Sequence, residues 1–446
     1  MRKRAAGVDL EGRRAEAGGV CFSVPQGIQL LLLALTMFAT VFASNAIGPL
    51  QETISHSLGL SDNQIAFLQG PAPWLPVVVG GIPLGMLADR LCRVRLLLIY
   101  ATLTIVASLA TAYATSFLLL LIARSVIGLL LNATWIAIMS LVSDLYPSEK
   151  RGRALTGIAF GECGGVAIAF AVGGALLVAL GPDADSWRWT ILWMTVPLVP
   201  LMLLLFAVRE PPRHDVLNKN LSVRGDFAAL WDLRAVVGVL VLGRIMLSIA
   251  DGAAVIWAAP MFARTYGLPA DRIGAMMGTI LLLRGVLGAV GAGLLADVCQ
   301  RFGGPRQTIT CLGIVALVSA PVALYPLAFH SMQSAAMLFL FIMCGSVIGV
   351  TTATVATVVI PNELRGLSIA VMQSCMCLLG AAPAPLAVSL LTGALGGPQM
   401  LSKSLAIVGV ISSALGALMF FVGRRHFPSQ GKDKLSKKDQ DREGLT

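Results

Sequence analysis

Long apolar runs without charged side chains recur along the whole chain, and they restrict its fold more than any other feature. One of them, residues 96–115, contains no charged residue at all. A bilayer core about 30 Å thick requires roughly 20 apolar residues for each helical span. In lipid only helices and closed barrels satisfy their backbone hydrogen bonds, and these runs lack the apolar and polar alternation of a membrane barrel. We therefore predict an all-α polytopic membrane protein.

Twelve transmembrane helices fit the 446 residues. A chain with 57% hydrophobic and only 13% charged residues is too apolar for a soluble globular protein of this length. We expect the spans to begin, to within about 2–4 residues, near Gly27, Ile65, Leu96, Ser116, Ala154, Thr190, Val236, Ile273, Gln307, Ala335, Leu367 and Leu405. An even number of spans places both termini on one side of the membrane.

The basic residues are sorted by loop rather than gathered into a patch. Of the 33 Lys and Arg residues, 26 lie in the two termini, the central polar segment and the loops that follow even-numbered spans. By the positive-inside rule these regions face the cytoplasm. The formal net charge of +10 is thus explained without a nucleic-acid partner, and we expect a plasma (inner) membrane protein in contact with membrane lipid, with both termini cytoplasmic.

Short strings recur in the second half of the chain at an offset of about 208 residues, slightly larger for the second string. They are Gly85-Met-Leu-Ala-Asp89 with Arg93 and Gly293-Leu-Leu-Ala-Asp297 with Arg301, then Pro147-Ser-Glu149-Lys-Arg151 and Pro361-Asn-Glu363-Leu-Arg365. Each follows an even-numbered span, on the predicted cytoplasmic face. Repetition at a long, nearly fixed spacing indicates an internal duplication, which predicts two pseudo-symmetric six-helix bundles.

The duplication sets the expected domain boundaries. They are a cytoplasmic N-terminal tail 1–26, an N-terminal six-helix bundle 27–208, a cytoplasmic linker 209–235, a C-terminal six-helix bundle 236–422 and a cytoplasmic tail 423–446. Pro211 and Pro212 end the sixth span because proline cannot continue a helix. Many secondary transporters place their solute site at the midplane between two such repeats, so we expect transport by alternating access.

At these residues the chain resembles the major facilitator superfamily. Gly85-x-x-x-Asp89-Arg90-x-x-Arg93 is similar to its signature between helices 2 and 3, although Cys92 stands where a second glycine is usual. Arg124-x-x-x-Gly128 is similar to the family's second motif. The amino-acid sequence of helices 1 to 5 looks most like the spinster-like and organic-anion branches of the superfamily. The resemblance implies a monomeric transporter rather than an enzyme, without a cofactor.

The resemblance also implies a cytoplasmic gate. Gly85 would let a neighbouring helix approach closely, and Asp89 would be favoured at the N-terminus of a facing helix, with Arg90 and Arg93 pairing with it or with lipid headgroups. The alternative is that the basic residues only follow the positive-inside rule. The candidate gating residues are Gly85, Asp89, Arg90, Arg93, Glu149, Arg151, Gly293, Asp297, Arg301, Glu363 and Arg365.

Five ionisable residues fall inside predicted spans: Arg124, Glu162, Arg244, Asp251 and Arg284. Each costs about 2.5 to 3.5 kcal/mol near a helix centre on insertion scales, which favours a functional role. Three arginines against two carboxylates leave a positive excess that suits an anionic solute. The alternative is a structural ion pair of Asp251 with Arg284.

We expect the solute to contact residues of helices 1, 4, 7 and 8. The candidate solute-binding residues are Asn45, Arg124, Asn132, Trp135, Arg244 and Arg284. Glu162 and Asp251 are the candidate proton carriers, since protonation of a carboxyl would release an arginine to bind the solute. Ser44 and Asn45 occupy the place where many proton-coupled members of the family carry an acidic residue.

These features predict a secondary active transporter that moves a small organic anion by alternating access, coupled to protons. No phosphate-binding loop occurs in the sequence, which argues against transport driven by ATP, and no metal-ligand spacing occurs among its histidines and cysteines. Two alternatives remain: export of amphipathic, drug-like or lipid-like molecules, and a non-transporting membrane receptor with a transporter fold.

Overall fold

The computed structural model describes residues 25–181, 183, 185–211, 231 and 233–427, and every regular element in these ranges is helical. Eleven helices of the described chain are long and apolar enough to cross a bilayer. The bent pair Asp62–Gly81 and Pro83–Arg90 adds a twelfth when it is taken as one span. The prediction of an all-α polytopic membrane protein is therefore confirmed. The predicted tails and linker lie largely outside the described residues.

The first six spans are built from ten helical elements, because several spans are broken. They are α2 (Gln26–Ser44), α3 (Ile47–Leu58), α4 (Asp62–Gln69), α5 (Pro71–Arg90), α6 (Arg93–Ala112), α7 (Phe117–Leu145), α8 (Ser148–Ala179), α9 (Ser186–Thr195), α10 (Leu198–Leu204) and the short 3-10 helix η1 (Leu205–Ala207). Span 1 breaks after Ser44, and span 2 breaks at Gly70.

The last six spans follow the same plan. They are α12 (Arg234–Tyr266), α13 (Ala270–Phe302), α14 (Gly304–Val322), η2 (Tyr325–Leu327), α15 (Ser331–Val359), α16 (Asn362–Met376), the π-helical η3 (Cys377–Ala381), α17 (Ala384–Ala394), η4 (Pro398–Met400), α18 (Leu401–Gly423) and η5 (Arg424–His426).

Two helices begin before the apolar stretches from which their spans were predicted. Helix α8 begins at Ser148 rather than near Ala154, and α16 begins at Asn362 rather than near Leu367. Pro147 and Pro361 are the N-cap residues of the two helices, and both have an extended backbone conformation. The helices therefore start directly after the prolines and carry polar first turns, which the apolar pattern does not register.

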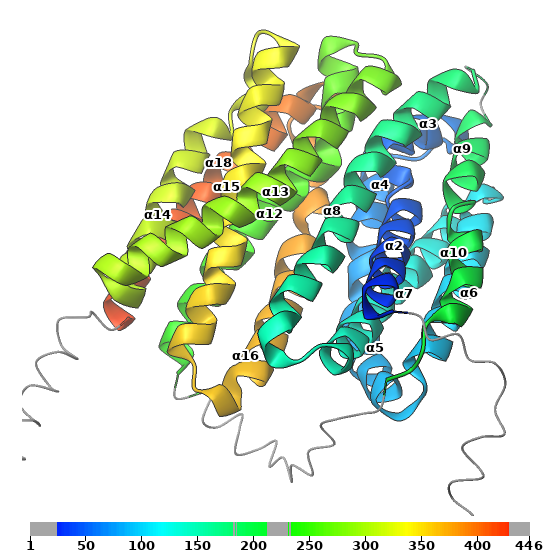
Figure 1. Ribbon diagram of the computed structural model, residues 1–446. Helices are drawn as coiled ribbons and strands as arrows, with labels where there is room; N and C mark the ends of the chain where they lie inside the picture. The colour runs from blue at the N-terminus through cyan, green and yellow to red at the C-terminus, as the bar shows by residue number, and fades with distance from the viewer. Residues whose placement is uncertain (1–24, 182, 184, 212–230, 232, 428–446) are drawn as a thin grey trace, which may run out of the picture.

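The helices form two groups that stand side by side, α2 to α10 in one and α12 to α18 in the other (Figure 1). We call the end where the described chain begins and finishes, and where α10 ends and α12 starts, the terminal end. The opposite end, where α3 ends and α4 begins, is the distal end. Helices α8 and α13 run along each other between the two groups (Figure 1).

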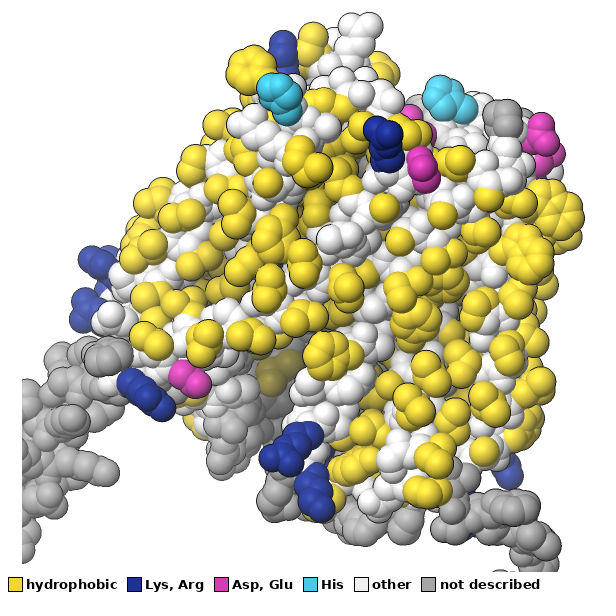
Figure 2. Space-filling view, turned by 45° about the horizontal axis from the view of Figure 1, so that its top comes forward, with side chains coloured by type: hydrophobic (Ala, Val, Ile, Leu, Met, Phe, Trp, Pro, Cys, Tyr) yellow, Lys and Arg dark blue, Asp and Glu magenta, His cyan; other side chains and the backbone are white. Residues whose placement is uncertain are grey.

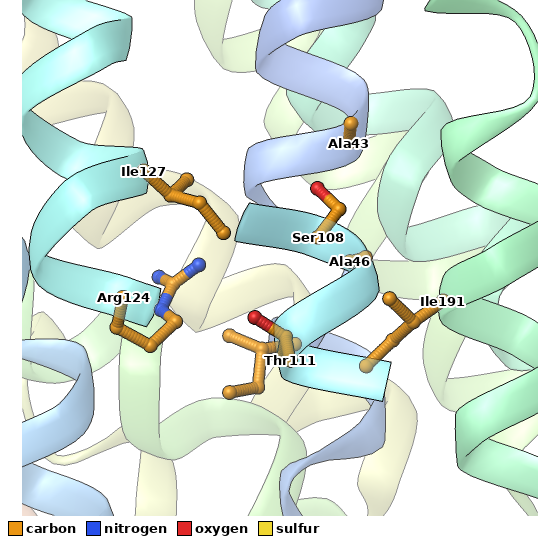
Figure 3. A pocket seen from close by; sticks show the side chains of 8 residues that line it. Ala43, Ala46, Ser108, Thr111, Arg124, Ile127 and Ile191 are labelled. Carbon is orange, nitrogen blue, oxygen red and sulfur yellow. The ribbon is translucent and has the colours of Figure 1, made fainter. Parts of the chain in front are cut away.

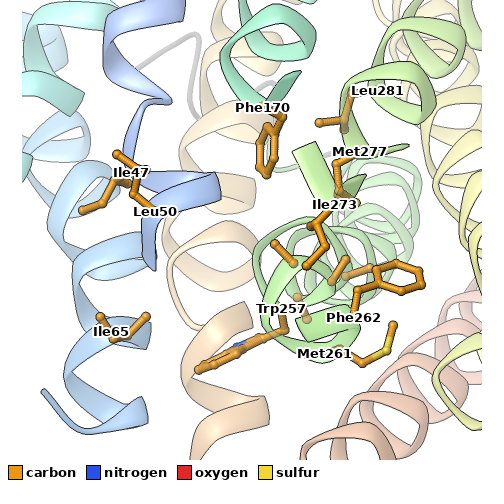
Figure 4. Close-up of a cluster of buried hydrophobic side chains, with 14 of the residues drawn as sticks. Ile47, Leu50, Ile65, Phe170, Trp257, Met261, Phe262, Ile273, Met277 and Leu281 are labelled. Atoms are coloured by element: carbon orange, nitrogen blue, oxygen red, sulfur yellow. The ribbon is translucent and has the colours of Figure 1, made fainter. Parts of the chain in front are cut away.

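An apolar core joins the two groups toward the distal end. It brings Leu50 of α3 and Phe170 of α8 together with Trp257 of α12 and Met277 of α13, all of them buried (Figure 4). The indole N–H of Trp257 donates to the carbonyl oxygen of Pro385 at 3.0 Å, so the buried ring keeps its hydrogen bond. This core holds the distal halves of the two groups in contact.

Glycines allow helices α8 and α13 to touch backbone to backbone. A Cβ on Gly174 would overlap the carbonyl oxygen of Ala270, and a Cβ on Gly274 would overlap that of Phe170. Small residues permit such approach between membrane helices. At the terminal end the expectation for Gly85 is wrong in this conformation, because a Cβ there, as at Gly293, would meet no atom within 4 Å. Among the described residues, no neighbouring helix reaches these two glycines.

The outer surface suits lipid. Large apolar side chains such as Leu31, Val106 and Leu294 are more than half exposed, and apolar side chains cover the middle of the visible face, with basic side chains along its lower edge (Figure 2). Figure 2 also shows a recess between the two helix groups in the lower part of this view. The candidate spans and this surface fit an integral multi-pass membrane protein.

The glycine contacts predict opposite outcomes for two matched substitutions. We expect Gly174→Ala to lower the melting temperature by several degrees, because its methyl group meets backbone that cannot turn aside. Gly85→Ala should leave it unchanged or slightly higher, since alanine favours the helix by about 0.5–1 kcal/mol over glycine. Thermal unfolding of the purified protein in detergent measures both. Equal effects of the two substitutions would contradict the α8–α13 contact.

Candidate functional site

Two of the predicted intramembrane charges form an ion pair. Arg284 in α13 donates to Oδ2 of Asp251 in α12 at 2.7 Å. The other carboxylate oxygen, Oδ1, is buried without a hydrogen-bond partner and faces Gly345 of α15. The pairing was the structural alternative in the sequence analysis. It leaves one carboxylate oxygen free, so the pair is not fully satisfied.

Arg244 lies about two helical turns before Asp251 on α12 and has different surroundings. Its guanidinium lies against Gly349, where an added Cβ would come 2.8 Å from Nη2. Its Nη1 group is buried and has no hydrogen-bond partner among the described residues. Arg244 is thus a partly buried cation within span 7 whose Nη1 group has no hydrogen-bond partner among the described residues. Glycine at 349 provides the space that the guanidinium occupies.

Helix α8 brings a second carboxylate toward the same region. Glu162 lies beside Trp135 of α7, and Glu162 and Arg284 both lie near Cys163. Cys163 itself packs against Gly285, the residue after Arg284. The structure therefore gathers Glu162, Trp135 and Arg284 around the contact between α8 and α13.

The remaining solute candidates lie apart from this cluster. Arg124 is buried and donates to the carbonyl oxygen of Ser44 at 2.6 Å, and the Asn45 amide donates to the carbonyl oxygen of Val41. Both side chains thus donate hydrogen bonds to backbone carbonyl oxygens in the last turn of α2. Asn132 faces α5, since a Cβ on Gly81 would lie 3.9 Å from its Oδ1.

At the terminal end, Arg93 has partners that the sequence analysis missed. The expected pairing of Arg93 with Asp89 is wrong: Nε donates to Glu210 at 2.7 Å, and Nη1 donates to Asp144. Asp144 ends α7 and Glu210 follows the sixth span, so Arg93 ties three spans of one helix group together. The charges stand near span ends, where carboxylates are common, and this explains why no local pattern identified them.

Glu210 also caps the N-terminus of α6, because the backbone N–H of Val94 donates to its Oε2 at 3.0 Å. Burial by itself raises the pKa of the Glu210 carboxyl, but the hydrogen bonds from Arg93 and Val94 bring it below the ordinary 4.5. A carboxylate at a helix N-terminus also meets the positive end of the helix dipole.

Four of the other gating candidates form no ion pair among the described residues. Asp89, Arg90, Asp297 and Arg301 are exposed and form no ion pairs within the described chain. Arg151 donates to the carbonyl oxygen of Ser143 at 2.6 Å, which caps the end of α7. The side chains of Glu149, Glu363 and Arg365 lie outside the described residues.

Comparison with known proteins decides the family. The model of the Major Facilitator Superfamily matches residues 33–385, well over half of the chain. The chain belongs to this superfamily. The predicted resemblance is therefore confirmed, and the relatives below are transporters by name rather than enzymes.

Relatives in the superfamily differ in the solutes they are named for. The chain is 31% identical over 144 residues to the glucose transporter GlcP of Staphylococcus epidermidis, covering 32% of this chain and 31% of GlcP. It is 35% identical over 138 residues to human solute carrier family 22 member 7, covering 31% of this chain and 24% of that one. The chain thus spans about a quarter to a third of the first curated relatives that it matches.

Solved structures of the superfamily share the fold over nearly the whole chain. A bacterial homologue of the human lysosomal transporter Spinster, in an inward-facing and unoccupied conformation, has a TM-score of 0.75 and 19% sequence identity. The match covers 90% of this chain and 97% of that one. At this identity the similarity establishes the fold alone.

At the distal end of this superfamily member, ion pairs as well as apolar packing join the two helix groups. Arg264, at the end of α12, donates to Glu52 of α3 at 2.8 Å and to Asp62 of α4 at 2.8 Å. These forked contacts join one helix group to the other. Basic residues are scarce in the distal loops, and Arg264 is one of four there, so that scarcity was the one sequence signal that could have singled it out.

We expect Arg264→Gln to loosen the distal closure. As a control, cysteines introduced at Thr265 and Ser402 should form a disulfide equally well in the parent and in the variant. Both positions lie in the C-terminal helix group, and their hydroxyls are 2.8 Å apart. A fluorophore pair at the distal ends of α3 and α13 should show a wider distance distribution in Arg264→Gln than in the parent. An unchanged distribution would show that apolar packing alone holds this end shut.

The Glu210 carboxylate predicts a pH-dependent stability. Because its folded-state pKa is lowered, its stabilising contribution is fully present above pH 4.5 and is lost as the pH falls through the lowered value. Glu210→Gln should therefore melt below the parent at pH 7, and the difference should shrink below about pH 4. Melting temperatures of both proteins across this range test the assignment, and a pH-independent difference would contradict it.

Proposed function

We propose that the protein is a secondary active transporter of a small organic anion, with the anion bound by Arg244 and Arg284. The observation that carries the proposal is the buried Nη1 of Arg244, which lacks a partner in mid-span beside the Asp251–Arg284 pair. A charge in that position is costly unless it is paired. An anionic solute would supply the missing partner.

The chemistry of guanidinium favours a carboxylate or a similar planar anion. Arginine presents paired N–H donors that match two anion oxygens in a fork. Gly345 and Gly349 of α15 let the Asp251 and Arg244 side chains lie directly against that helix. Trp135, which is 41% exposed, provides an apolar face from α7 for the body of the solute. A relative named as a probable 4-methylmuconolactone transporter, 26% identical over 279 residues, also supports a small organic solute.

We infer that Asp251 couples transport to protons. In its ionised form it holds Arg284, and when a proton binds the free Oδ1, the carboxyl loses its charge and its hold on Arg284 weakens. Arg284 is then free to donate to the solute together with Arg244. Glu162, on the facing helix α8, is the second proton site of the proposal. Loss of the proton restores the ion pair and favours release of the anion.

Alternating access follows from the asymmetry between the two ends. In the proposal, the bundles 27–208 and 236–422 rock about their contact, with segment 209–235 as the link. The distal end is closed by Arg264 and the apolar core, whereas Gly85 and Gly293 at the terminal end have no close neighbour. With the terminal end on the cytoplasmic side of a plasma membrane, as the basic residues favour, this is an inward-facing state of a monomer.

A ligand screen with matched variants tests the anion site. Organic anions and lipophilic cations are screened by thermal shift, and the affinity of each anionic hit is measured in Arg244→Gln, Arg284→Gln and the exposed control Arg272→Gln. We expect losses of at least about tenfold, or about 1.4 kcal/mol, in the first two and none in the control. Unchanged affinities in both site variants would refute the anion site.

Uptake into proteoliposomes separates the transport proposal from its alternatives. Hits that are only lipophilic cations would favour export of amphipathic molecules, and binding without transport under any gradient would indicate a receptor. For coupling, we expect Asp251→Asn to retain anion exchange while losing its acceleration by an inward proton gradient. The exposed Asp183→Asn variant serves as its control, and an Asp251→Asn protein that still responds to the gradient would exclude Asp251 as the proton carrier.

A further inference from the structure

A second buried arginine lies in the other helix group, beside a small cavity. Arg124, about two turns into α7, lines the cavity with Ser108 and Thr111 of α6, and apolar residues of α2, α3, α7 and α9 complete it (Figure 3). The guanidinium and the two hydroxyls point toward one another across this space (Figure 3). The site is separate from Arg244 and Arg284, which belong to α12 and α13.

Arg124 is incompletely paired. Its Nη1 donates to the carbonyl oxygen of Ser44, the last residue of α2, which the break in span 1 leaves free of a backbone partner. This bond gives the guanidinium the partial negative charge of a helix C-terminus. The buried Nε, however, has no partner, and no carboxylate of the described chain forms an ion pair with Arg124. A full positive charge therefore remains without a counterion.

The hydroxyl groups around the cavity leave a donor free. Thr111 uses its hydroxyl hydrogen on the carbonyl oxygen of Ala107 at 2.8 Å. The hydroxyl oxygen of Ser108 is buried, on a side chain that is 2% exposed, and has no partner. The Ser108 hydroxyl and the Arg124 guanidinium are thus unsatisfied donors on the wall of one cavity, and unsatisfied buried donors are rare in native proteins.

The size of the cavity limits what these donors can hold. Its volume is about 10 Å³, roughly the room that one water-sized particle needs. An organic anion does not fit, so Arg124 is not part of the proposed solute site in this state. A water molecule fits but brings no charge, and an isolated buried cation is costly.

We propose that this cavity binds a single halide ion, chloride in physiological media, held by Arg124 and Ser108. The ion neutralises the buried guanidinium and accepts the hydrogen bond from the Ser108 hydroxyl. By fixing Arg124 on the carbonyl oxygen of Ser44, it stabilises the break between α2 and α3 near the distal end. Chloride is then a structural ligand of the N-terminal helix group and not a transported solute.

Melting of the full-length purified protein tests the proposal. Sodium fluoride, chloride and bromide are titrated against sodium gluconate at constant ionic strength. A ligand that binds only the folded state raises the melting temperature with a saturable dependence on its concentration. We expect such a rise of several degrees with chloride or fluoride, a smaller one with bromide, and its loss in Arg124→Gln and in Ser108→Val, whose methyl groups fill the cavity. Arg244→Gln should retain it.

Bromide provides a second readout if Arg124→Gln does not fold. A crystal soaked in bromide should show an anomalous peak between Arg124 and Ser108, absent in Ser108→Val. A response that is the same for all anions and does not saturate would show that the cavity holds water alone and would overturn the proposal. So would an organic anion whose binding depends on Arg124, because Arg124 would then belong to the solute site. Failure of the Arg244 variants to affect solute binding bears only on the proposed function.

Discussion

The bilayer interior offers no water to hydrogen-bond a polar group, and the whole structure is arranged around that constraint. Helices satisfy the backbone within each span, so the polar groups that remain are those at helix breaks and those with charged side chains. At the break in span 1, the carbonyl oxygen of Ser44 accepts a hydrogen bond from the side chain of Arg124. In mid-span, Asp251 holds Arg284. The buried Nη1 of Arg244 is left without a partner among the described residues, and it is there that the proposed anion would bind.

The two ends of the molecule differ in how closely the helix groups approach. Toward the distal end, the backbone contact at Gly174, the apolar core around Trp257 and the forked ion pairs of Arg264 all join the groups. At the terminal end, Arg93 ties together spans of one group only. In the proposed function, two helix groups that are packed together at the distal end would rock about that contact, which is the motion that alternating access requires.

The site of Arg244 and Arg284 contains a carboxylate, whereas the cavity beside Arg124 does not. Arg244 and Arg284 share a region with Asp251, so the charge available to a solute there depends on whether that carboxyl carries a proton. Arg124 has a helix terminus and a hydroxyl nearby instead, neither of which titrates near neutral pH, so its charge is constant. A site of variable charge suits a solute that binds and leaves, whereas a site of constant charge in a small cavity suits a permanent ligand.

The sequence by itself determined the membrane location, the number of spans and the family, because apolar runs and repeated strings are local signals that need no knowledge of neighbours in space. It also identified every ionisable residue of the central cluster, since a charge inside an apolar run stands out. Only the tertiary structure decided which charges meet: Arg93 with Glu210 rather than Asp89, and Arg264 with Glu52, more than 200 residues away. Ion pairs form between side chains a few ångströms apart in space, and that distance is set by how the helices pack, which no local pattern of residues records.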